Sequence, residues 1–347
     1  MTSNDAIALT LMPFFIALLL HWVPLWRRQN LWFGVTVPPG FRTTPEGAAA
    51  LRHYRVWIWA TALIASVCAF AGAEQRWAWL APIGLLGQAA SGSVAFAIAR
   101  RGVRRFAVPP SGTRSAALAS IPEGLPGGLG AVLFPLGMLA ATAAYLGANW
   151  ARLPERLPTH WSIDGTANRW ATRSWHSVFG PLIVCAVISV FMIGMAEMII
   201  HASPRGRGTG TEAWTSRFRR ANLLLLVAGI WAVSAMICVI SLLPLFSDAG
   251  RPAWMVGALP LIVIGTMLPF VIQLVRLTRD ASSGTDGTPD RCWKLGQIYY
   301  NPDDPAMVVE KRFGLGYTLN CGHRGLVWIL GVAVLVFVLL RLMRTTG

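Results

Sequence analysis

The sequence predicts an all-α polytopic membrane protein of about eight transmembrane helices, with a small β-rich cytoplasmic loop before the last helix. Three observations support this class: the composition, the length of the apolar stretches and the placement of the basic residues. Of 347 residues, 54% are apolar and only 13% are charged, about half of the roughly 25% typical of a soluble domain. This composition excludes an ordinary soluble enzyme and a disordered basic tail.

Eight apolar stretches approach or exceed the roughly 20 residues with which a helix crosses the hydrocarbon core. They cover 7–26, 56–73, 77–99, 126–148, 177–200, 222–246, 253–275 and 325–342. The second stretch is short and the third contains Gln88, Ser91 and Ser93, so these two are the weakest candidates. No Lys or Arg precedes the first stretch, unlike a secretory signal, so we expect it to remain as a helix.

A net charge of +15 is typical of a protein that binds nucleic acid. Here, however, the placement of the charges indicates the orientation of the chain in a membrane. Segments 27–55, 100–125, 201–221 and 276–324 contain 22 of the 30 Lys and Arg residues. By the positive-inside rule these alternate loops are cytoplasmic and both termini are extracytoplasmic. We therefore expect the lipid bilayer, with its anionic headgroups, rather than nucleic acid as the direct partner of the basic face.

The predicted spans divide the chain into five segments. Residues 1–148 form a first four-helix membrane unit, 149–176 an extracytoplasmic loop domain, 177–278 a three-helix membrane unit, 279–324 a linker with a small β-rich cytoplasmic domain, and 325–347 the last helix and tail. Within the first seven spans, Glu197 and His21 are the only acidic and basic residues, and both lie near predicted cytoplasmic ends. A coupled transporter usually carries a charge at mid-membrane, so this placement disfavours transport.

The extracytoplasmic loop 149–176 is the largest loop on its face, and its turn and aromatic residues predict a folded binding loop. Its candidate ligand-binding residues are Pro158, His160, Trp161, Asp164, Gly165 and Arg173. A metal or catalytic site formed by His160, Asp164 and His176 is an open alternative, since His and carboxylate ligands suit zinc. Their spacing matches no known metal motif, so we predict no metal and no cofactor.

The residues of this loop resemble a family pattern. Leu157-Pro158-Thr159-His160-Trp161, then Asp164-Gly165, Arg173 and Pro181, resemble the P-x-H-(aromatic)…G…K…P pattern of SdpI-like membrane proteins, with Arg173 at the usual Lys position. In that family the pattern forms an extracytoplasmic domain of unknown function. The best understood members confer immunity to a secreted toxin and hold a transcriptional repressor at the membrane.

The resemblance implies a multi-pass protein of the bacterial plasma membrane that acts in sensing or immunity and is not an enzyme. Its implied partners are an extracellular peptide or toxin and a cytoplasmic transcriptional regulator. Two alternatives remain: a small-solute transporter or permease, motivated by the many helices and mid-span prolines, and a membrane-embedded hydrolase built on His160, Asp164 and His176.

The first cytoplasmic loop contains Asn30, Gly34 and Pro38 in a spacing similar to the N-x-(aromatic)-x-G-x-x-x-P element of SdpI-like proteins, with Thr36 at the family's Arg position. Gly34 permits a turn, and Pro38 favours extended backbone before it. We predict a structural turn at the membrane surface, followed by a helical stretch from Pro45 to position 55.

The last cytoplasmic loop, 276–324, divides into a Gly/Ser/Thr/Asp-rich linker at 280–290 and a segment of β-strand character. Strand-like runs at 298–300, 307–309 and 313–318 predict a β-hairpin or a three-stranded unit.

Between the first two runs, Asn301-Pro302-Asp303-Asp304-Pro305 is a strong turn signal. Asn301, Pro302, Asp303 and Pro305 resemble the hallmark of a second short domain of unknown function, found at the C-terminal side of some SdpI-like proteins. They are the candidate cytoplasmic interaction residues. Asp303 and Asp304 are expected to be solvated carboxylates, with a cation site as the alternative.

Overall fold

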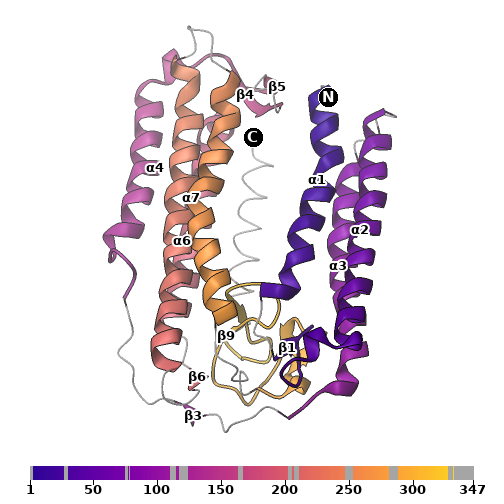
Figure 1. The fold of residues 1–347 in the computed structure, drawn as a ribbon. Helices are drawn as coiled ribbons and strands as arrows, with labels where there is room; N and C mark the ends of the chain where they lie inside the picture. Colours follow the sequence, from indigo (N-terminus) through magenta and orange to yellow (C-terminus); the bar gives the residue numbers. More distant parts are fainter. Residues whose placement is uncertain are drawn as a thin grey trace. The chain divides into compact units, whose positions relative to one another are not determined.

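The structure is a computed structural model. It describes residues 3–26, 30–74, 77, 79–109, 115–116, 124–162, 167–201, 205–206, 211–246, 253–280, 288–326 and 331 (Figure 1). Seven helices in this part are long and apolar enough to cross a membrane, which confirms a multi-pass membrane protein. They are α1 Ser3–Trp22, α2 Pro45–Glu74, α3 Leu80–Val103, α4 Gly130–Ala148, α5 Trp175–Ile200, α6 Thr211–Leu242 and α7 Ala253–Asp280. Nearly all of the eighth predicted span, 325–342, lies outside the described residues.

Three predicted helix boundaries are corrected, and the largest difference is at α6, which begins at Thr211 rather than near 222. The helical stretch expected at 45–55 and the second span are one continuous helix, α2, which begins at Pro45. Proline suits the first turn of a helix because the first amide groups have no acceptor there. At the third boundary, α3 continues to Val103 rather than ending near 99. Arg100, counted above among the loop residues, is therefore helical.

The chain forms two compact units. Unit 1 contains Met1–Ser120, Ala202–Phe218 and Gln273–Arg324; unit 2 contains Ile121–His201, Arg219–Ile272 and Gly325–Gly347. Helices α6 and α7 therefore contribute to both units. Short 3-10 helices lie at Val23–Trp26, Phe41–Thr43, Arg104–Phe106, Trp150–Arg152, Leu243–Phe246 and Asp290–Cys292.

In unit 1, polar side chains join α1, α2 and α3. Gln88 Nε2 donates to the Pro13 carbonyl at 2.8 Å, and Trp57 Nε1 donates to Ser91 Oγ at 2.7 Å. Such bonds stabilise helix association where lipid provides no hydrophobic drive between helices. They explain why the third apolar stretch carries polar residues.

Two short β-hairpins of unit 1 come from segments far apart in the sequence. In the first, β1 (Leu31–Trp32) pairs with β2 (Val35–Thr36). Its turn residues Phe33 and Gly34 both have positive φ, 46° and 69°, the pattern of a type I′ turn. The predicted turn at Gly34 is confirmed.

The second hairpin belongs to the loop after α7. There β7 (Trp293–Lys294) pairs with β8 (Ile298–Tyr299), and β9 (Val308–Glu310) pairs with β10 (Tyr317–Leu319). A parallel bridge between Tyr299 and Asn320 joins the two pairs. The β-rich loop is confirmed, although Phe313–Gly316 is not a strand because Gly314 and Gly316 both have positive φ. A further pair in unit 1 joins β3 (Ser115–Ala116) to β6 (Arg205–Gly206).

In unit 2, α4 and α5 pack through a core that includes Leu139, Leu146, Phe179 and Cys185. Trp231 of α6 donates its indole N–H to the Ala131 carbonyl at 2.7 Å. The chain between α4 and α5 forms a longer hairpin, in which β4 (Arg156–Trp161) pairs with β5 (Ala167–Thr172). We call it the β4–β5 hairpin.

Candidate functional sites

Arg173 holds the two ends of the β4–β5 hairpin together. Its Nη1 donates to the carbonyls of Trp150 (3.1 Å) and Leu153 (2.5 Å), and its guanidinium lies 5.7 Å from the Trp150 ring centroid. Its backbone N–H also donates to the Glu155 carbonyl at 2.7 Å. These contacts give Arg173 a positioning role at the base of the hairpin, while its ligand-binding role stays a prediction.

The first turn of α5 holds the C-terminal end of the β4–β5 hairpin in place. Ser174 and Ser177 form a reciprocal capping box, which satisfies two amide groups at the helix N-terminus. The rings of Trp150, Trp175 and Phe179 pack on one another, with centroids 4.6–6.1 Å apart. The hairpin is therefore anchored at both ends by hydrogen bonds and aromatic packing.

The far half of the hairpin presents an exposed polar and aromatic surface. His160 Nδ1 lies 2.7 Å from Asn168 Oδ1, and Asn168 Nδ2 donates to Ser162 Oγ at 2.8 Å. Because an amide oxygen only accepts, Nδ1 of His160 is the donor in this contact. His160 and Arg169 are exposed, and Trp170 is 48% exposed. We call the exposed residues His160, Arg169 and Trp170 together the hairpin face, although Arg169 and Trp170 are consecutive in β5 and so project from opposite sides of the hairpin.

The predicted binding residues of this loop divide into three groups. Pro158 is buried and Trp161 is half-buried, so they support the hairpin, whereas His160 is on its exposed face. Asp164 and Gly165 lie outside the described residues. The sequence reasoning did not assign Arg169 and Trp170, although a basic and an aromatic residue side by side in a polar loop could have indicated them.

The described residues contain no group of three or more His, Cys, Asp and Glu side chains that could hold a metal ion. The ring partner of His160 in this part of the chain is an amide, not the carboxylate or second histidine that the hydrolase alternative requires.

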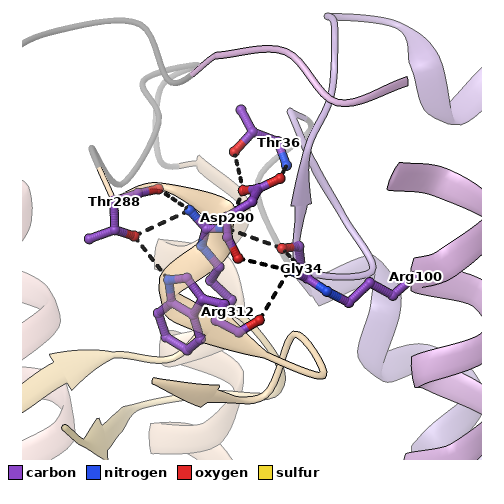
Figure 2. A network of polar contacts seen from close by, with 7 residues as sticks. Gly34, Thr36, Arg100, Thr288, Asp290 and Arg312 are labelled. Atoms are coloured by element: carbon purple, nitrogen blue, oxygen red, sulfur yellow. Dashed lines mark hydrogen bonds and ion pairs between the residues drawn. The ribbon is translucent and has the colours of Figure 1, made fainter. Parts of the chain in front are cut away.

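In unit 1, the tips of the two short hairpins meet at the end of α3 (Figure 2). Arg100, which is 6% exposed, donates from Nη1 to the Gly34 carbonyl of the first hairpin. Its Nη2 donates to the carbonyls of Asp290 (3.0 Å) and Trp293 (3.1 Å). One guanidinium therefore links α3 to both loops.

A second buried arginine completes this junction. Arg312, 2% exposed, forms an ion pair with Asp290 (Nη1–Oδ1 2.5 Å) and donates to the Gly34 carbonyl at 3.1 Å. Its Nη2 donates to the Thr288 carbonyl at 2.5 Å. Asp290 in turn accepts from the backbone N–H (3.3 Å) and hydroxyl (3.1 Å) of Thr36. We call Gly34, Thr36, Arg100, Thr288, Asp290 and Arg312 the arginine junction.

The backbones at the arginine junction are too close for side chains on their turn residues. A Cβ placed on Gly34 would lie 2.8 Å from the Gly296 carbonyl oxygen, and one on Gly296 would lie 3.0 Å from Phe96 and Arg100. Both glycines also have positive φ. Thr36, in the first hairpin, binds Asp290 through its backbone N–H and its hydroxyl.

A further cation lies beside the first hairpin. The guanidinium of Arg42 is 4.7 Å from the Trp32 ring centroid, and its Nη2 donates to the Leu31 carbonyl at 3.1 Å. Burial, with a smaller repulsion from Arg279, lowers the pKa of Arg42 to about 10. The side chain stays protonated at neutral pH and supports the hairpin.

Asn320 organises the predicted turn at 301–305. Its Nδ2 donates to the carbonyls of Asn301, Asp304 and Ala306 at 2.8–3.2 Å, and its Oδ1 accepts from the Asn301 and Gly322 amides. Asp304 is 1% exposed and accepts from Tyr299 Oη at 2.7 Å and from the Ala306 amide at 3.0 Å.

The expectation that Asp304 is solvated was therefore wrong, because its hydrogen bonds within the loop replace water. Of the four predicted interaction residues, Asn301 is half-buried, while Pro302, Asp303 and Pro305 are exposed together. Asp303 is thus a solvated carboxylate, as expected.

Two family models match parts of the chain. Residues 137–185 match a Domain of unknown function (DUF1648), which covers the end of α4, the β4–β5 hairpin and the first half of α5. Residues 302–327 match a Family of unknown function (DUF5808), which covers the turn after Asn301 together with β9 and β10. No curated protein and no solved structure matches the chain. The helices and these matches define a multi-pass membrane protein with two domains of unknown function, as predicted.

The close approach at Gly34 predicts that a side chain at this position destabilises the protein by more than its unfavourable backbone conformation alone. Gly34→Ala and Gly40→Ala both place a side chain at positive φ, which costs about 1–2 kcal/mol of stability. Of the two positions, only at Gly34 would the new Cβ meet another atom. We expect Gly34→Ala to lower the thermal unfolding midpoint of the purified protein clearly more than Gly40→Ala. Equal shifts for the two variants would contradict the close contact.

The buried ion pair predicts strong coupling between Asp290 and Arg312. Removing one partner of a buried pair costs about 3–5 kcal/mol because the other charge is left without compensation. We expect Asp290→Asn and Arg312→Met each to destabilise the protein, and the double variant to cost less than their sum. Unfolding of the four proteins measures this coupling, with Asp303→Asn as an exposed control. Additive effects would contradict a direct pair.

Proposed function

We propose that this chain is an SdpI-like protein of the bacterial plasma membrane that acts in sensing or immunity without catalysis. In this proposal the hairpin face binds an extracytoplasmic peptide, toxin or other ligand. The loop after α7 then contacts a cytoplasmic regulator, and both termini are extracytoplasmic. The observation that supports it best is an exposed recognition surface on a hairpin whose base is fixed by Arg173.

The chemistry of the hairpin face suits a peptide ligand. Tryptophan and arginine are enriched among the residues that dominate binding energy at interfaces. Trp170 offers an apolar ring, Arg169 a guanidinium for carboxylates, and His160 a polar imidazole ring. Because the base is held by hydrogen bonds to carbonyls, less conformational entropy is lost when a ligand binds.

The loop after α7 supports the second half of the proposal. Arg100 and Arg312 tie this loop to the first hairpin and to the end of α3. Pro302, Asp303 and Pro305 are therefore exposed on a platform that is hydrogen-bonded to the end of α3. Such a platform can transmit a change in helix packing to a bound regulator.

The transporter alternative has less support. Gln88 Nε2 and Ser91 are engaged in bonds between helices, which favours packing over a solute path.

The orientation predicts how native Cys321 reacts. Cys321 is exposed in the loop after α7, whereas Cys185, Cys238 and Cys292 are buried. We expect a membrane-impermeant maleimide to label Cys321 in inverted vesicles and not in intact cells.

The matched control reverses this accessibility. In a Cys321→Ser background, Arg169→Cys places a thiol on the hairpin face, and it should be labelled in intact cells. Labelling of native Cys321 in intact cells would reverse the proposed topology.

The ligand-binding role predicts a phenotype in the native bacterium. We expect deletion of the gene to raise sensitivity to a sibling toxin or antimicrobial peptide, or to abolish a transcriptional response to it. The double variant Arg169→Ala/Trp170→Ala should reproduce this defect at normal protein abundance, because it removes the guanidinium and the ring from an exposed surface.

Trp79→Ala is the control, since Trp79 is 57% exposed and lies outside the hairpin. If deletion changes neither sensitivity nor transcripts, the sensing and immunity role is wrong.

A further inference from the structure

A cleft of about 610 Å³ opens between the start of α2 and the end of α3. The two helices are consecutive and antiparallel, so the first turns of α2 lie beside the last turns of α3 (Figure 1). This volume falls within the range of about 300–1,000 Å³ that small-ligand pockets occupy. No residue of the hairpin face or of the arginine junction lines it.

The rim of the cleft is basic. Arg52, His53 and Arg105 line it and are exposed, and Glu46 is the acidic residue among its walls. In the described part of the chain these four side chains form no ion pair with one another. The Arg105 guanidinium lies 4.8 Å from the Phe106 ring centroid, within the range of a cation–π contact. The rim is therefore suited to an anion.

The deeper part of the cleft is apolar. Trp57, Ala95 and Ile98 line it. At 1.5 Å per helical residue, Trp57 lies about 7.5 Å further along α2 than Arg52, and Ala95 lies about 12 Å before the end of α3 at Val103. Arg105 follows in the 3-10 helix Arg104–Phe106. Trp57 and Ile98 are 43% and 48% exposed. The walls therefore change from basic to apolar in the direction that leads from the helix ends into the membrane.

We propose that this cleft binds an anionic phospholipid, with the phosphate against Arg52, His53 and Arg105 and an acyl chain against Trp57, Ala95 and Ile98. A free anion satisfies the basic rim but not the apolar walls, whereas a phospholipid matches both in the correct order. Basic pockets between membrane helices are known to bind anionic headgroups. The site is independent of the proposed sensing role, because neither proposed docking surface contributes to it.

The test uses the full-length protein in detergent, titrated with phosphatidylglycerol, with phosphatidylcholine or with inorganic phosphate. Native mass spectrometry counts the bound lipids, and the thermal unfolding midpoint reports their stabilising effect. We expect phosphatidylglycerol to bind and stabilise, and the other two to have little effect. Arg52→Ala/Arg105→Ala should weaken phosphatidylglycerol binding by roughly 25-fold, about fivefold for each basic residue near an anionic headgroup.

The control is Arg101→Ala/Arg104→Ala, which removes the same charge from exposed positions at the same helix end but outside the cleft. Its affinity should stay within a few-fold of the parent protein. A second variant, Gly102→Trp, fills the cleft without removing charge. Gly102 lines the cleft, and a Cβ there meets no atom within 4 Å. It should also abolish binding.

Three results would overturn the proposal. If Arg52→Ala/Arg105→Ala and Arg101→Ala/Arg104→Ala weaken phosphatidylglycerol binding equally, the lipid responds only to the overall positive charge of this helix end. Equal binding of phosphatidylcholine would remove the role of the basic rim. Equal stabilisation by inorganic phosphate would identify an anion site that does not use the apolar walls. Circular dichroism of each variant verifies that the helices remain folded.

Discussion

The ion pair between Arg312 and Asp290 is the interaction on which the organisation of unit 1 depends. Taking these charges out of water is costly, and it is tolerated only because further groups complete their hydrogen bonds. Thr36 supplies donors to Asp290, and the carbonyls of Thr288 and Gly34 accept from Arg312. These partners come from two loops that are separated by about 250 positions. The ion pair itself lies within the loop after α7, but its full set of hydrogen bonds forms only when both loops have reached their native positions.

Arg100 extends the same constraint to a membrane helix. Together with Arg312 it places two cations and one carboxylate in a buried space, and the excess positive charge is balanced by carbonyl dipoles of both loops. The aromatic rings of Phe33, Phe96 and Phe313 pack beside it, with centroids 4.3–5.3 Å apart. Polar and apolar contacts therefore specify one arrangement of the helix end and the two loops.

Hydropathy and charge were sufficient to predict the multi-pass class, because apolar length is a local property of the sequence. The turn at Gly34 and the strands after position 298 were also predicted, since turn and strand signals act over a few residues. The arginine junction was not predicted. Arg100 and Arg312 were counted as basic loop residues, and a one-dimensional charge count cannot distinguish a buried cation from a solvated one. Likewise, Asp304 resembled a surface carboxylate until its partners Tyr299 and Ala306 were placed.

The length of α2 sets the height of the first loop above the bilayer. A helix of 30 residues is about 45 Å long, and the hydrocarbon core is about 30 Å thick. The helix therefore exceeds the core by about 15 Å, or nearly three turns. Its first turns contain the exposed residues Glu46, Arg52 and His53, so this end of α2 is suited to lie outside the core. The β1–β2 hairpin precedes this end by a few residues, and α2 therefore acts as a spacer between the hairpin and the acyl chains.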